Sequence, residues 1–245
     1  MNPLDIRIVL VEPTHPGNIG ASARAMKNMG LAHLHLVRPR HFPHAEATAR
    51  ASGADDLLAR ARVHERLEDA VADCALVIGA SARRRTIEWP TLTPREAAPK
   101  ILATAAEAPV ALLFGREHAG LTNAELDRCH ALLHIPVNPE YPSLNLGAAV
   151  QVVAYELFLA RQGGEAPKAD HVPAPAAAME AFYRHLEETL VDIGFLDPDN
   201  PKQAMRRLRR LFNRAAPDEL ELNLLRGILS AAQGAKWRRA RRGGE

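Results

Sequence analysis

Short apolar runs alternate along the chain with longer segments in which apolar residues recur every three or four positions. The runs lie at residues 6–11, 33–37, 74–78, 110–114 and 132–137. Runs of this length that are apolar at most positions are typical of parallel strands buried on both faces. The segments between them include helical stretches at 68–74 and 94–107. This alternation predicts an α/β domain whose parallel sheet is covered by helices on both faces.

Two of the predicted helices have recognisable ends. Asn18 is of a residue type that commonly caps a helix start, and Gly30 suits the left-handed position that follows a helix end. A longer helix is predicted over residues 145–161, because apolar residues line one of its faces. That face comprises Leu146, Val150, Val153 and Leu157.

The composition changes after residue 162. Residues 163–175 are rich in Gly, Pro and Ala and have no periodicity, so we predict a linker between a domain at 1–162 and a small all-α extension at 176–245. Pro201 suits the first turn of a helix in that extension. One apolar stripe of the extension comprises Met179, Phe182, Tyr183, Leu186, Leu190 and Ile193, and a second comprises Leu220, Leu224, Leu225, Ile228 and Leu229.

The composition excludes several classes of protein. With 245 residues, 47% hydrophobic and 24% charged, the chain is typical of a globular protein. No apolar stretch approaches the roughly 20 residues of a membrane span, and the N-terminus does not resemble a signal peptide. The two cysteines, Cys74 and Cys129, make neither a disulfide framework nor a metal-binding cluster. We expect a cytoplasmic protein that has no membrane partner.

The net charge of +2 hides an uneven distribution. Residues 201–245 hold 12 Lys and Arg against 4 Asp and Glu, a local net charge of +8, whereas the rest of the chain has a net charge of −6. A basic end on an acidic chain indicates a surface for a polyanion such as nucleic acid. A solvated basic helix face explains the same charge equally well.

Polar residues gather in three segments that follow apolar runs, at 16–24, 114–123 and 135–146. In an open α/β sheet, ligands bind beyond the carboxyl ends of the strands, so these segments predict one composite site. The chain lacks the glycine-rich dinucleotide fingerprint, the phosphate loop ending in Gly-Lys-Ser/Thr and the H-E-x-x-H zinc motif. Its histidines have no metal-ligand spacing, and we expect no metal.

The amino-acid sequences and the order of these three segments resemble the three motifs of the SPOUT class of S-adenosylmethionine-dependent RNA methyltransferases. Within that class they are most similar to the bacterial TrmJ group. Residues 190–198 and 224–229 are similar to the C-terminal extension of that group. The resemblance implies a parallel sheet with a C-terminal trefoil knot, a homodimer, S-adenosylmethionine as methyl donor, and 2′-O-methylation of a cytidine or uridine at tRNA position 32.

The resemblance also assigns roles to residues of the three motifs. Arg24 and Ser143 are expected to be catalytic. The donor pocket is expected to contain Ala80, Ser81, Ala82, Gly115, Ile135, Pro142, Ser143 and Leu144. RNA contacts are expected from Asn18, Arg24, Arg83, Arg84, Arg85, Glu117 and Asn145. Pro142 has no N–H, so it can contact a ligand only through its carbonyl or its ring.

Ordinary structural roles remain open for several of these residues. Arg24 can be a solvated helix side chain, Arg116 and Glu117 can form a local ion pair, and Ser143 can be a plain helix cap. Arg24 is a poor base because its guanidinium stays protonated; it can clamp a phosphate and stabilise an oxyanion, or a phosphate can relay the proton. Two other functions are also open, a non-catalytic tRNA-binding module and a methyltransferase that acts on ribosomal RNA.

Overall fold

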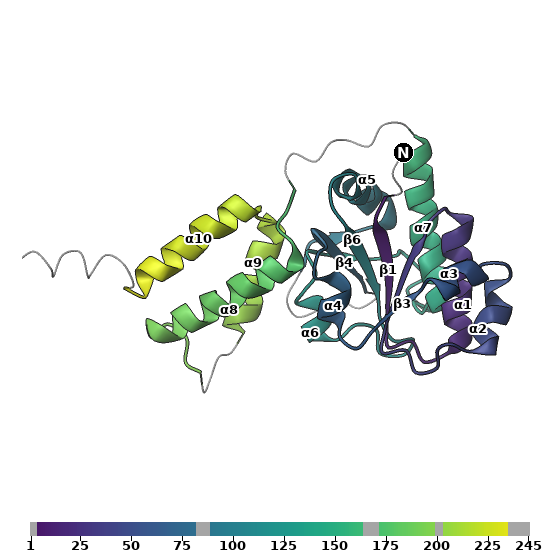
Figure 1. The fold of residues 1–245 in the computed structure, drawn as a ribbon, viewed down its shortest axis with the longest axis horizontal. Coiled ribbons are helices and arrows are strands. Elements are labelled where there is room, and N and C mark those ends of the chain that lie inside the picture. Colours follow the sequence, from purple (N-terminus) through teal and green to yellow (C-terminus); the bar gives the residue numbers. More distant parts are fainter. Residues whose placement is uncertain (1–3, 82–88, 164–171, 199–202, 235–245) are drawn as a thin grey trace, which may run out of the picture.

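The computed structural model describes residues 4–81, 89–163, 172–198 and 203–234 of the chain (Figure 1). In this described part, seven parallel strands form one sheet in the order β3-β2-β1-β6-β4-β7-β5. The strands are β1 (Ile6–Val11), β2 (His33–Val37), β3 (Arg62–His64), β4 (Leu76–Ala80), β5 (Thr91–Leu92), β6 (Val110–Phe114) and β7 (Ala131–Leu133). The predicted parallel sheet is confirmed.

Two predicted strands differ in their bounds from the observed ones. The run at 74–78 begins as a strand only at Leu76, because the N–H of Cys74 is donated to the carbonyl of Val71 in the turn before it. The run at 132–137 pairs only as far as Leu133, after which the chain leaves the sheet. The edge strands β3 and β5 were not predicted, since three and two residues are too few to show a pattern.

Helices cover both faces of the sheet, and the alternation of side chains along β1 shows why. Ile6, Ile8 and Leu10 point to one core, whereas Val9 and Val11 point to the other. The first core is completed by α1 (Pro16–Asn28), α2 (Ala45–Ala51), α3 (Asp55–Ala59), α5 (Pro94–Ala105) and α7 (Leu146–Gln162). The second is completed by α4 (Leu67–Val71) and α6 (Asn123–Leu126).

The ends of α1 and α7 differ in part from the prediction. Asn18 is not a cap: α1 begins at Pro16, which suits the first helical position, and His15 is the capping residue. Gly30 has a φ of +70° and follows the C-cap, as predicted. Asn145 caps α7, since its Oδ1 accepts the N–H groups of Gly147 and Ala148. Ser143 is therefore not a plain helix cap.

The extension forms a three-helix unit of α8 (Ala176–Asp192), α9 (Ala204–Ala215) and α10 (Glu219–Ala232). Its core contains Met179, Phe182, Tyr183, Leu186 and Leu222. The first predicted stripe is confirmed over this part of α8, but Ile193 lies beyond the helix end and is 51% exposed.

The second predicted stripe is correct only in part, since Leu225 and Leu229 pack against the core of the unit. Leu220, Leu224 and Ile228 are exposed, and Leu222, outside that stripe, is buried instead. Since α8 already fills one side of the unit, only one narrow face of α10 meets the core. The predicted helix start at Pro201 lies outside the described residues.

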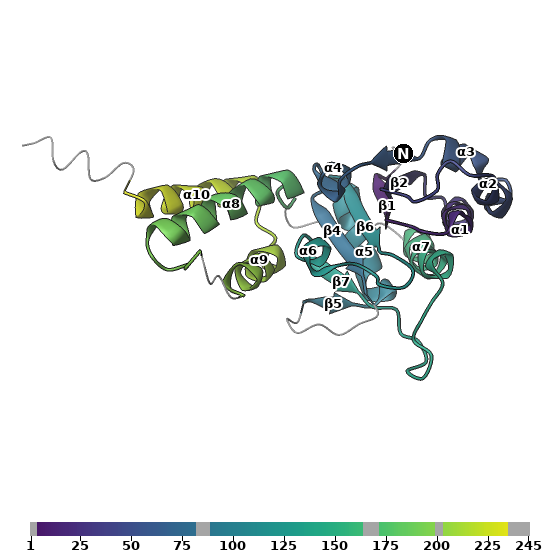
Figure 2. The same cartoon turned by 90° about the horizontal axis from the view of Figure 1, so that it is seen from below.

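The helical unit lies beside the sheet domain on the side of α4 and α6 (Figures 1 and 2). The side chain of Asn213 is buried between them: its amide donates to the carbonyls of Asp127 and Cys129, and its Oδ1 accepts from the hydroxyl of Tyr183. Arg206 pairs with Asp127 at 3.0 Å. The linker's residues 164–171 are outside the described part, and the boundaries at 162 and 176 stay a prediction.

Candidate active site

A cavity opens where the carboxyl ends of β4, β6 and β7 approach the start of α7. Seven of the eight residues predicted for the donor pocket line it: Ala80, Ser81, Gly115, Ile135, Pro142, Ser143 and Leu144. The eighth, Ala82, lies outside the described residues. The structure therefore brings segments from three distant parts of the chain to one wall, as expected for the crevice at the strand ends.

Most residues that line the cavity are apolar, and a few, among them Ser81, Glu117 and Ser143, are polar. Several apolar wall residues in or beside these segments were not predicted: Phe114, Leu121, Leu133, Val137, Leu146 and Ala149. Apolar walls with a few placed polar groups are usual for a small-molecule site.

The loop after β6 folds back tightly on itself along the cavity. Gly120 donates its N–H to the carbonyl of Arg116 at 2.8 Å, and a Cβ on Gly115 would lie 2.2 Å from the carbonyl carbon of Gly120. Only glycine fits at position 115, because any side chain would push the two halves of the loop apart. This close approach explains why a glycine follows β6 directly.

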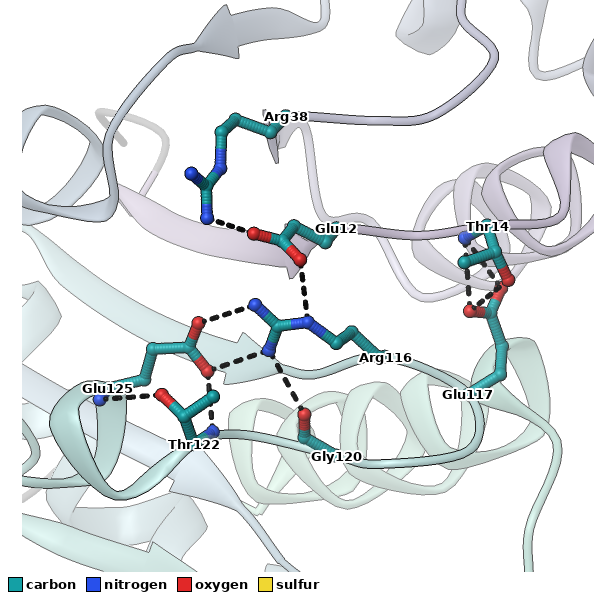
Figure 3. Close-up of polar contacts among 8 residues, drawn as sticks. All are labelled: Glu12, Thr14, Arg38, Arg116, Glu117, Gly120, Thr122 and Glu125. Atoms are coloured by element: carbon teal, nitrogen blue, oxygen red, sulfur yellow. Dashed lines mark hydrogen bonds and ion pairs between the residues drawn. The ribbon is translucent and has the colours of Figure 1, made fainter.

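Glu117 ties this loop to the start of α1. Its carboxylate accepts hydrogen bonds from the N–H and hydroxyl of Thr14, the N–H of His15 and the amide of Asn18, at 2.8–3.2 Å. Burial opposes ionisation of Glu117, but these hydrogen bonds outweigh it and lower its pKa to about 2. The local ion pair between Arg116 and Glu117, which the sequence left open, does not form, because Glu117 points to the start of α1 (Figure 3).

The predicted residues Asn18, Glu117 and Asn145 form one continuous chain of hydrogen bonds. The Asn145 amide donates to Oδ1 of Asn18 at 2.8 Å, and Asn18 donates to Glu117 at 3.0 Å. Each residue belongs to a different motif, so the three motifs are joined through their side chains. The sequence predicted that these three residues contact RNA. The structure shows in addition that they hold one another in place, which becomes visible only once the three segments lie side by side.

Arg24 lies on α1, two turns from its start, with an exposed side chain. Among the described residues it forms no hydrogen bond or ion pair. It does not line the cavity, so it is free to meet a second molecule. Arg83, Arg84 and Arg85 lie outside the described residues. Within the described part, no group of three or more potential ligands could hold a metal ion, and no helix is long and apolar enough to cross a membrane.

Family models match both parts of the chain. Residues 5–155 match the SpoU rRNA methylase family, and residues 177–244 match the C-terminal domain of the tRNA methyltransferase TrmJ. The chain belongs to the TrmJ family of SpoU methylases.

Individual TrmJ proteins are similar over almost the whole length. The tRNA (cytidine/uridine/adenosine-2′-O-)-methyltransferase TrmJ of Pseudomonas aeruginosa is 54% identical over 93% of this chain and 93% of its own. The tRNA (cytidine/uridine-2′-O-)-methyltransferase TrmJ of Sodalis glossinidius is 52% identical over 94% of this chain and 91% of its own. The crystal structure of TrmJ from Z. mobilis ZM4 has a TM-score of 0.80 and 40% identity over 92% of this chain and 97% of its own.

Proposed function

We propose that this TrmJ-family protein transfers the methyl group of S-adenosylmethionine to the ribose 2′-hydroxyl of a cytidine or uridine at position 32 of tRNA. The observation that carries the proposal is the cavity at the strand ends, lined by the motif residues after β4, β6 and β7. The tRNA substrate is supported by the names of the relatives and by the match to the TrmJ C-terminal domain. Position 32 is supported by the resemblance to the TrmJ group.

The residues of the cavity suit S-adenosylmethionine. Gly115 lets the loop after β6 close up as a wall, Ile135 and Leu144 offer apolar surface, and Ser143 offers a hydroxyl. Pro142 contacts the donor through its carbonyl or its ring. When bound, the donor supplies a methyl group that is already electrophilic. The protein must then align the 2′-hydroxyl with that group and ease the loss of the hydroxyl proton.

Arg24 is proposed to act on the RNA side of this site. Its guanidinium stays protonated, so we assign it to clamp the phosphate beside the target ribose and to stabilise negative charge on the attacking oxygen. Its exposed position on α1 and its lack of an ion pair among the described residues support this role.

A homodimer is proposed from the outer face of α7. Val152, Tyr155 and Leu159 are 37%, 48% and 38% exposed and recur at helical spacing, opposite the buried face of the same helix. A two-fold axis would bury this face against its own copy. The family also implies a trefoil knot near the start of α7. We place the protein in the cytoplasm with its tRNA.

The test is methyl transfer to unmodified tRNA from a labelled donor, with chelator added to one series. We expect transfer that chelator does not change, a loss of at least about a hundredfold in Arg24→Ala, and little recovery in Arg24→Lys, because an ammonium lacks the planar fork of donors. A protein that binds tRNA without transfer would be a binding module. Transfer to ribosomal RNA alone would favour the other methylase function.

A further inference from the structure

Arg116 stands at the centre of an ion-pair network that no part of the proposed mechanism uses. Its Nε donates to Glu12 at 2.7 Å, and its two terminal nitrogens donate to the two oxygens of Glu125 at 3.0 and 3.1 Å (Figure 3). One of these nitrogens also lies 3.3 Å from the carbonyl of Gly120. The Arg116 side chain is 20% exposed, and all three guanidinium nitrogens have partners.

The three partners come from three different elements. Glu12 follows the end of β1, Gly120 lies at the far end of the loop after β6, and Glu125 lies in α6. Glu125 is itself fixed, since it forms a reciprocal capping box with Thr122. A planar guanidinium held by two carboxylates has one geometry, so Arg116 sets where its loop lies relative to β1 and α6.

The backbone beside this network is unusual at Glu12. Glu12 has a φ of +49°, a conformation that residues other than glycine seldom adopt, and it also pairs with the exposed Arg38. Non-glycine residues persist in this conformation where surrounding contacts hold them. Here the N–H of Glu12 is donated to the carbonyl of Val37 and its carboxylate is held by two arginines.

The loop that Arg116 holds is a wall of the cavity. Arg116, Glu117, Ala119, Gly120 and Leu121 all line it. The loop is fastened twice: Glu117 binds the start of α1, and Arg116 binds β1 and α6. Glu117 thus connects the loop to the RNA-side helix, whereas Arg116 connects it to the opposite neighbours of the loop, the end of β1 and α6.

We propose that Arg116 is a positioning residue that sets the affinity for the methyl donor, and that it does not contact RNA. The inference rests on the proposed function. Removing the guanidinium releases the wall formed by residues 116–121, which must then be ordered whenever the donor binds, so donor affinity falls. Once the donor is bound, the loop is in place again, and the rate at saturating donor changes little.

The test is calorimetry of the full-length protein with S-adenosylhomocysteine, the demethylated donor, together with methyl-transfer kinetics. For Arg116→Met we expect a loss of donor affinity of roughly tenfold or more, a matching rise in the donor KM, and a kcat within about threefold. Arg116→Lys should behave similarly, since a point charge cannot serve both carboxylates. A combined Arg116→Met and Glu125→Gln variant should bind no worse than Arg116→Met alone, because the two side chains act as a pair.

Arg7→Lys is the matched control. Like Arg116, Arg7 is held by two carboxylates, here Asp5 and Asp73, but it does not line the cavity. The Arg7→Lys variant should have a lower unfolding midpoint than the wild type and an unchanged affinity for the donor. Equal losses of donor affinity in Arg7→Lys and Arg116→Lys would mean that general destabilisation is the cause, and would overturn the proposal.

Two further results would also overturn it. One is unchanged donor affinity in Arg116→Met. The other is weaker tRNA binding with a log–log salt slope reduced by about 0.7–0.9, which is the mark of a lost phosphate contact. A wild-type protein that binds no donor would contradict the proposed function instead, so the two failures are distinguishable.

Discussion

Replacing Glu117 with glutamine tests the link between the loop after β6 and the start of α1. The carboxylate faces four donors, the N–H and hydroxyl of Thr14, the N–H of His15 and the amide of Asn18. Glutamine keeps the size of the side chain but removes the charge and turns an N–H₂ group toward these donors. At least one donor therefore loses its acceptor.

The expected loss of stability follows from the pKa of Glu117. A fall from 4.5 to about 2 corresponds to an upper limit of about 3.4 kcal/mol at about 1.36 kcal/mol per pH unit. The carboxyl is partly exposed, so solvent screening reduces this to about 1–2 kcal/mol. The unmet donor adds about 1 kcal/mol. Glu117→Gln should therefore lower the free energy of unfolding by about 2–3 kcal/mol at pH 7.

The pH dependence gives a second check with a definite sign. Because folding lowers the pKa of Glu117, its stabilisation is fully present above pH 4.5 and is lost as the pH falls toward 2. Urea denaturation at pH 7, 4.5 and 3.5 gives the free energy of unfolding of the wild type and of Glu117→Gln. The difference between these two free energies should become smaller as the pH falls. Glu107→Gln, at an exposed site after α5, is the control. A difference below about 0.5 kcal/mol at pH 7, or one that widens in acid, would refute the reasoning.

Three other predictions concern separate parts of the molecule. Burial, with Arg7 and His64 nearby, lowers the pKa of His35 to about 4, so stability should fall as the pH drops from 6.5 toward 4, and His35→Gln should flatten this dependence in denaturation curves. Gly115→Ala should weaken donor binding by more than about tenfold in calorimetry, because the new Cβ would lie 2.2 Å from backbone; unchanged binding would mean that the loop yields easily. Deleting residues 164–245 should weaken tRNA binding and flatten its salt dependence in titrations at two salt concentrations, with donor binding retained; an unchanged slope in a folded truncation would assign the basic region to a solvated appendage.

The deletion has a structural consequence that the basic charge alone does not suggest. Met179, Phe182 and Leu186 pack within the helical unit, so they do not support the sheet domain. Contacts between the two parts come from Arg206 and Asn213, which bind Asp127 and Cys129, and from the start of α8. There Ala176 and Ala177 donate their N–H groups to the carbonyls of Cys74 and Ala72, and Ala176 packs against the second core. Losing them frees the carbonyls of Ala72, Cys74 and Asp127, which water can satisfy, whereas the carbonyl of Cys129 still accepts from Trp89 Nε1. The sheet domain should therefore stay folded.

The sequence predicts the sheet well where strands are apolar and long enough. Residues 6–11, 33–37 and 110–114 match β1, β2 and β6 residue for residue, since central parallel strands must be apolar on both faces. The edge strands β3 and β5 escape prediction because a few residues carry no periodicity. The face of α10 is also beyond the pattern, since the spacing shows that a stripe exists but not which neighbour buries it.

The sequence predicts which residues belong to the candidate site, but it does not predict which of them contact one another. Strand-end segments and family resemblance place seven described residues at the cavity. Neither shows that Glu117 binds Thr14, 103 positions away, or that Arg116 pairs with Glu12, 104 positions away. The spacing of Thr122 and Glu125 is typical of a capping box, but it was not among the predictions, and it points to neither Arg116 nor Glu12.

The most direct test of the central claim is to locate the methyl group. Unmodified tRNA is incubated with the protein and S-adenosylmethionine, cut with a base-specific ribonuclease, and the fragments are sequenced by mass spectrometry. We expect one added methyl group on the ribose of the pyrimidine at position 32, present with wild-type protein and nearly absent with Arg24→Ala. A methyl group on a base, on a ribose at another position, or placed equally well by Arg24→Ala would contradict it.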